Sequence, residues 1–239
     1  MKKILYILDE NQQPPSGVVS VVNEQLKYFS TQNYKIQILT NKNHWLKKKN
    51  IFNHSKIKIS KLNFYLPEEI KIQYNYNNFF LKILFRLFLF FPLLIYSGYV
   101  LIKLTTIINQ INPNIILNNN GGWPGGQLNR YSVISSFILR LNSVFAIHNY
   151  PIKKNITNYF SILIDNFFLR NCTSEIVTVT NDCKKYISKY LKTDNVSVIY
   201  NGTKNQEFKN LKIRKSNKRS NNKIKIGYFG KIEKRKGIE

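Results

Sequence analysis

The chain has 239 residues, enough to bury a sizeable core and to form one large domain or one domain and part of a second. Its hydrophobic content of 43%, with only 10 Gly and 7 Pro, excludes a disordered, collagen-like or mucin-like chain. Lys and Arg outnumber Asp and Glu by 37 to 12, a formal net charge of +25, which should attract phosphates, nucleic acid or an anionic membrane surface.

Strands and helices alternate along the first part of the chain. Ile4–Leu8 is a short apolar run typical of a strand buried on both faces. Apolar residues recur at helical spacing from Val18 to Phe29, and the alternating patterns of Tyr34–Thr40 and Lys56–Phe64 predict two further strands. These segments form a strand, helix, strand unit with a third strand after it.

The alternation continues to about position 200. After a helical stretch from Phe79 to about Gln110, four further strands are predicted at Asn114–Asn118, Ser143–Ile147, Glu175–Thr180 and Val196–Tyr200. Helices are predicted between them at Gln127–Asn142, Asn155–Asn171 and Asn181–Leu191, the last with Asn181 as its N-cap. This order predicts an α/β fold, a Rossmann-like doubly wound parallel sheet that binds ligands at the carboxyl ends of its strands.

The pattern breaks down in a basic stretch before the end of the chain. Residues from Thr203 to Asn222 are mostly Lys, Arg, Asn and Ser, as in an exposed linker. Lys223–Gly230 then repeats the alternation of a first strand. We therefore predict three segments: a first domain (1–203), a basic linker (204–222) and the start of a second, incomplete Rossmann-like domain (223–239).

Phe79–Ile102 is the most apolar segment, with Lys82 and Arg86 as its only charges. Its uncharged part, Leu87–Ile102, would span roughly 24 Å as a helix, short of the roughly 30 Å of a bilayer core. Pro92 also interrupts it. The segment is compatible with a buried core helix, with a helix lying at an anionic bilayer surface, and less well with a membrane span.

Other classes of site lack their sequence patterns. The two cysteines, Cys172 and Cys183, have no CxxC or Cys/His spacing around them, so we expect reduced thiols and no metal site. The sequence contains no GxSxG, Walker, HExxH or GxGxxG motif and no recognised nucleic-acid-binding pattern. The apolar run Ile4–Leu8 is too short for a signal-peptide core of about 7–15 residues, which favours the cytoplasm.

Three candidate sites follow predicted strands. Gln12–Gly17 leads into a helix whose free backbone N–H groups would favour an anion. Asn118–Gly126 carries four glycines that allow close approach of a ligand, and Trp123 in this loop could stack on a sugar ring. His148 stands at the end of a strand, where such sheets bind ligands. Each candidate has a structural alternative: a simple tight turn for Gln12–Gly17, a flexible turn for Asn118–Gly126, and a structural core residue for His148.

The order of these segments resembles the GT-B glycosyltransferases, particularly those with an N-terminal domain of the retaining, family-4 type. The resemblance extends over the whole chain. It is carried by Ser16-Gly17-Val18-Val19, the loop NNNGGWPGG, Ile147-His148-Asn149, Thr178–Asn181, Val198–Gly202, and Gly227–Lys231 followed by Lys236-Gly237.

The resemblance implies two Rossmann-like domains, the first for the acceptor and the second for a nucleotide sugar, with neither a metal nor a cofactor. It places His148 at the reacting sugar as the catalytic residue. It assigns substrate binding to Ser16, Gly17, Gly121, Gly122, Asn149 and Asn201, and donor-phosphate binding to Gly230, Lys231 and Lys236. Lys231 stands where arginine is usual in the family, which keeps the charge but loses the bidentate fork.

The implied activity is transfer of a sugar from a nucleotide-diphosphate sugar to a glycan or lipid-linked acceptor in surface polysaccharide assembly. The protein is expected at the inner face of the membrane, bound peripherally to its anionic surface. The family's acidic E-x7-E region would follow Glu239, so we expect the chain alone to be inactive unless a second chain completes it. The alternative is a non-catalytic membrane- or glycan-binding remnant of a split glycosyltransferase.

Overall fold

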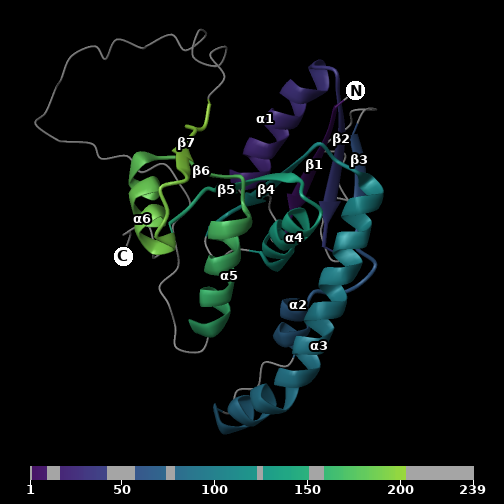
Figure 1. Ribbon diagram of the computed structural model, residues 1–239, viewed down its shortest axis with the longest axis vertical. Helices are drawn as coiled ribbons and strands as arrows, with labels where there is room; N and C mark the ends of the chain where they lie inside the picture. Colours follow the sequence, from purple (N-terminus) through teal and green to yellow (C-terminus); the bar gives the residue numbers. More distant parts are fainter. Residues whose placement is uncertain are drawn as a thin grey trace, which may run out of the picture. The chain divides into compact units, whose positions relative to one another are not determined.

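A computed structural model describes residues 2–9, 17–41, 57–73, 79–122, 126–150 and 159–202 (Figure 1). The chain divides into two compact units, Met1–Asn201 and Gly202–Glu239. All the helices and strands of the described residues belong to the first unit. The predicted linker and the predicted start of a second domain, 204–239, lie outside the described residues.

The first unit contains one seven-stranded sheet in which every neighbouring pair of strands is parallel. The strand order is β3-β2-β1-β4-β5-β6-β7. This confirms the predicted Rossmann-like α/β fold, and each of the seven strands predicted before position 203 is present within a few residues of its expected bounds. The strands are β1 (Lys2–Leu8), β2 (Tyr34–Thr40), β3 (Ile57–Lys61), β4 (Ile115–Asn120), β5 (Asn142–Ile147), β6 (Glu175–Thr178) and β7 (Val196–Val198).

Helices connect the strands in the described residues. They are α1 (Gly17–Thr31), α2 (Pro67–Gln73), α3 (Phe79–Ile111), α4 (Gln127–Ile138), α5 (Tyr159–Cys172) and α6 (Asn181–Leu191). The sequence did not predict the short helix α2. The predicted N-cap of α6 is wrong, because the Thr180 hydroxyl accepts the Cys183 N–H at 3.1 Å. The Asn181 amide instead donates to the Tyr200 hydroxyl at 2.9 Å.

Alternation along β1 sends its side chains to opposite faces of the sheet. Tyr6 and Leu8 pack against α1 on one face, whereas Leu5 and Ile7 belong to the core that α3 covers on the other. The chain runs outward from β1 to β2 and β3, and then returns to add β4 on the other side of β1. The strand order therefore reverses between β1 and β4, the place where open α/β sheets bind ligands.

The long helix α3 has two different halves. Val100, Leu104 and Ile108 are fully buried against the sheet. Before them, Phe88 and Ile95 are 78% and 76% exposed. The stretch Phe88–Ile111 is the one helix in the described part of the chain that is long and apolar enough to cross a membrane. One half of α3 is thus a core helix, and the other presents an apolar surface.

The exposed half of α3 lies beyond the carboxyl edge of the sheet. The Tyr96 hydroxyl donates to the carbonyl of Tyr65 at 2.9 Å, and Tyr65 follows the carboxyl end of β3. Residues of α3 that precede Tyr96 therefore continue past this edge, and Figure 1 shows the helix running well beyond the strands. The apolar surface therefore lies on the side of the domain to which the carboxyl ends of the strands point, the edge at which open α/β sheets bind ligands.

Candidate functional site

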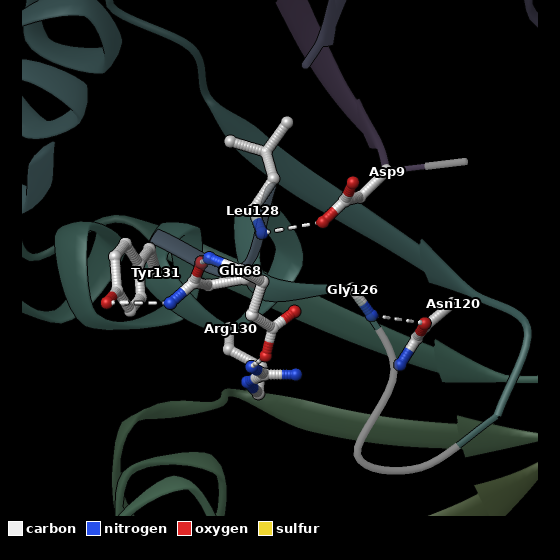
Figure 2. Close-up of polar contacts among 8 residues, drawn as sticks. Asp9, Glu68, Asn120, Gly126, Leu128, Arg130 and Tyr131 are labelled. Carbon is white, nitrogen blue, oxygen red and sulfur yellow. Dashed lines mark hydrogen bonds and ion pairs between the residues drawn. The ribbon is translucent and has the colours of Figure 1, made fainter. Parts of the chain in front are cut away.

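The carboxylate of Asp9 lies at the reversal of strand order, directly after β1. Its Oδ2 accepts the backbone N–H of Leu128, in the first turn of α4, at 2.8 Å (Figure 2). Burial raises the pKa of Asp9 to about 6, with a smaller raising effect from Glu68, while the Leu128 N–H and Arg130 act in the opposite direction. Asp9 can therefore take up or release a proton near neutral pH, which is a property of many catalytic carboxyls.

Gly126 makes room for this carboxylate. A Cβ atom placed on Gly126 would lie 2.4 Å from the Asp9 Oδ2, far inside van der Waals contact. Gly126 is the N-cap of α4 and makes no side-chain cap of its own, so Asp9 supplies the missing acceptor from another strand. The glycine is needed for close approach rather than for an unusual backbone conformation.

Asn120, the last residue of β4, fastens the two ends of the glycine loop. Its Nδ2 donates to the carbonyl of Gly122 at 2.6 Å, and its Oδ1 accepts the N–H of Gly126 at 3.2 Å. The Asn120 carbonyl also accepts the N–H of His148 at 3.1 Å. One buried asparagine therefore connects the loop after β4, the start of α4 and the end of β5.

Helix α2 forms the rim of the site on the side of β3. Glu68 makes an ion pair with Arg130, and its backbone N–H donates to the Gln127 side chain at 2.8 Å (Figure 2). Glu69 accepts the Leu66 N–H at 2.7 Å and a hydrogen bond from Asn41, which follows β2, at 3.4 Å. These contacts tie α2 to α4 and to the carboxyl end of β2.

His148 occupies the predicted position at the carboxyl end of β5. Its ring nitrogens are buried and have no hydrogen-bond partner among the described residues. Burial lowers the pKa of His148, so the neutral imidazole is the form expected near pH 7. A neutral ring can accept one hydrogen bond and donate another, which suits recognition of a sugar hydroxyl.

The structure brings together most of the predicted site residues that it describes. An ideal Cβ on Gly121 would lie 3.7 Å from Val18, next to Gly17, and one on Gly122 would lie 3.6 Å from Asn149. Asn201 follows β7, which is two strands away from β5 in the sheet. Five further predicted residues lie outside the described residues: Ser16, Trp123, Gly230, Lys231 and Lys236.

The sequence interpretation missed Asp9 and Asn120. Asp9 follows the first apolar strand directly, so the strand-end argument that selected His148 would also have selected it. Asn120 lies in an Asn-rich chain, in which a single asparagine carries little information. Its role depends on contacts with residues on two other elements, which no local pattern shows.

No protein-family model matches the sequence, and no curated protein matches it. Similar solved structures include MnaA of S. aureus in a co-structure with UDP, the sucrose-phosphate synthase of Thermosynechococcus elongatus, and the lipopolysaccharide outer core galactosyltransferase WaaB in its apo form. Their TM-scores are 0.48, 0.47 and 0.44, with 11%, 12% and 12% sequence identity.

The alignments cover 83%, 84% and 84% of this chain, and 43%, 90% and 46% of the three solved chains in the same order. The chain thus spans less than half the length of MnaA and of WaaB. These values describe a similarity of the α/β arrangement and assign no activity to this chain.

Replacing Gly126 by Ala should destabilise the fold by about 1–3 kcal/mol, because the new methyl group must displace the Asp9 carboxylate. Gly98→Ala is the matched control, since nothing lies within 4 Å of its Cβ position inside α3. It should stabilise by about 0.5–1 kcal/mol through helix propensity. Urea unfolding measures both, and equal effects would contradict the close contact.

Asp9→Asn should change how stability depends on pH. Because the folded-state pKa of about 6 exceeds the ordinary 3.8, the contribution of Asp9 to stability is fully present below about pH 4 and is lost as the pH rises through 6. The amide can still accept the Leu128 N–H but does not ionise. The free energy of unfolding of the variant, relative to wild type, should therefore rise by up to about 3 kcal/mol between pH 4 and pH 7. A difference that stays constant over this range would show that Asp9 titrates normally.

Proposed function

We propose that this domain is the acceptor-side half of a GT-B glycosyltransferase of the retaining, family-4 kind, which uses a nucleotide-diphosphate sugar and needs no metal. The observation that carries the proposal is the gathering of Asp9, the glycine loop held by Asn120, and His148 at the reversal of strand order. A sugar bound at this edge would lie near a titratable carboxyl and an imidazole.

In this proposal His148 contacts the reacting sugar through its ring nitrogens. Gly17 lies near the donor phosphates, and Gly121, Gly122 and Asn149 line the acceptor side. Ser16 and Asn201 keep the substrate-binding roles that the family resemblance implies. Gly230, Lys231 and Lys236 hold the donor phosphates at the start of a second domain, which another chain can complete.

We further propose that the exposed half of α3 binds an anionic membrane surface from the cytoplasmic side. Its outward apolar residues recur at helical spacing and are 49–78% exposed. They are Phe88, Phe91, Ile95, Tyr99 and Ile102. A continuous apolar stripe of this kind marks an interaction surface, and the chain's net charge of +25 complements anionic lipids. Because α3 extends past the carboxyl edge of the sheet, a docked helix would turn the site toward a lipid-linked acceptor, as in surface polysaccharide assembly.

A peripheral position is favoured over a membrane span. A span that includes Val100, Leu104 and Ile108 would remove fully buried side chains from the core they share with Leu5 and Ile7. Burying an aliphatic side chain contributes about 1.5–3 kcal/mol, so extraction of this half would cost the domain most of its stability.

His148→Ala should weaken contact with sugars while leaving the fold intact, because removal of the imidazole nitrogens leaves no partner unpaired among the described residues. Saturation-transfer NMR of the protein with a panel of nucleotide-diphosphate sugars and short glycans measures this contact. We expect signal on sugar ring protons that falls at least about fivefold in the variant.

Tyr28→Ala, an exposed change on α1, serves as the control and should retain the sugar signal. A lowered thermal midpoint of His148→Ala with unchanged sugar contact would instead make His148 a structural residue.

Membrane binding should depend on the exposed stripe of α3. In flotation with anionic vesicles, Phe88→Ser combined with Phe91→Ser should reduce bound protein at least about tenfold. Phe137→Ser combined with Ile138→Ser, at the end of α4, removes similarly exposed apolar area and should have little effect. Protein that resists release by carbonate would favour a spanning helix over the peripheral position.

A further inference from the structure

A concave surface lies on the face of the sheet that α3 covers, at the side of β2 and β3. It encloses a volume of about 540 Å³. The strands contribute cationic and polar side chains, and the last turns of α3 form one wall. The lining residues are Lys3, Lys35, Gln37, Leu39, Lys58, Ser60, Lys61, Asn63, Ile107, Gln110 and Ile111, here called the basic groove.

The groove exists because α3 covers β1 more fully than its neighbours. Parallel sheets normally bury both faces under helices, with apolar side chains on each. Here β2 and β3 present Lys35, Gln37, Lys58 and Ser60 to the same face, and the Gln37 amide donates to the Ser60 hydroxyl at 3.1 Å. Only Leu39 at the far end of β2 joins the apolar core of this face. The strands are thus built for contact with a polar partner.

The charges in the groove have one sign. The Lys3 ammonium donates to the carbonyl of Ile111, at the C-terminus of α3, which fixes its position. Lys35 and Lys58 are exposed and form no ion pair among the described residues. Lys61 also lines the groove, and the lining residues that the structure describes include no carboxylate. The mutual repulsion of these lysines is relieved when an anion binds.

We propose that the basic groove binds a metabolite-sized anion with two or more phosphate groups. The volume falls in the range of small-molecule sites, about 300–1,000 Å³. The ammonium groups would contact the phosphates, while Leu39, Ile107 and Ile111 offer apolar area to the organic part.

The groove is separate from the candidate active site. Lys3, Lys35 and Lys58 stand near the amino ends of β1, β2 and β3. Lys61 and Asn63 extend the groove to the carboxyl end of β3, but β3 is the edge strand, two strands away from β1, whereas Asp9 and His148 follow β1 and β5. This site therefore does not depend on the proposed glycosyl transfer.

The test is isothermal titration of the 239-residue protein with inorganic tripolyphosphate and, separately, with ADP at fixed ionic strength. We expect one site per chain, and Lys35→Gln combined with Lys58→Gln should weaken binding at least about tenfold. Lys185→Gln combined with Lys189→Gln removes the same charge from the exposed side of α6 and should change binding less than about twofold. Tighter binding of ADP than of tripolyphosphate would show that the apolar wall contributes.

Equal weakening by the two double variants would show diffuse attraction to a basic protein and would overturn the proposal, as would the absence of binding. Acetylation of the wild-type protein provides a second measurement that needs no variant. Tripolyphosphate should protect Lys35 and Lys58 but leave Lys185 and Lys189 reactive. Uniform protection, or none, contradicts a site in the groove.

Discussion

The hydrogen bond from the Leu128 N–H to the Asp9 carboxylate joins residues 119 positions apart, and the geometry of the candidate site depends on it. It fixes the start of α4 against the end of β1, across the reversal of strand order. A buried carboxylate beside Glu68 is costly, and the helix N-terminus and Arg130 offset only part of that cost, which is why the pKa of Asp9 rises. A carboxyl pKa perturbed in this way is typical of functional positions.

The rest of α4 is fixed to β4 and α3 by side-chain hydrogen bonds. Its buried face is polar, with Ser132 donating to the Asn118 side chain of β4 and Ser135 accepting from Thr105 of α3 at 3.0 Å. Buried polar groups that pair in this way fix one arrangement more sharply than apolar packing does. The same helix therefore contacts α3 through Ser135, and its N-cap Gly126 is held by Asn120 of β4.

Helix α3 has one part in the core and another part exposed to solvent. Its last turns complete the apolar core, its middle passes the carboxyl edge at Tyr96, and its earlier turns present Phe88 and Phe91 to solvent. A helix that is apolar on all sides suits burial on one side and a lipid or protein partner on the other. The fold thus places an exposed apolar surface next to the carboxyl edge of the sheet.

The sequence by itself determined the α/β class, the seven strands and the continuous helix α3, because periods of two and 3.6 residues are local properties of the chain. It also placed His148 at a strand end. Only the tertiary structure decided the strand order, and with it the meeting of Asp9, Gly126 and Asn120, since these contacts join distant segments. Packing likewise decided that Thr180 caps α6, because several residue types can cap a helix. It also decided that a groove lies over β2 and β3, because the alternating pattern of a strand does not specify what covers each face.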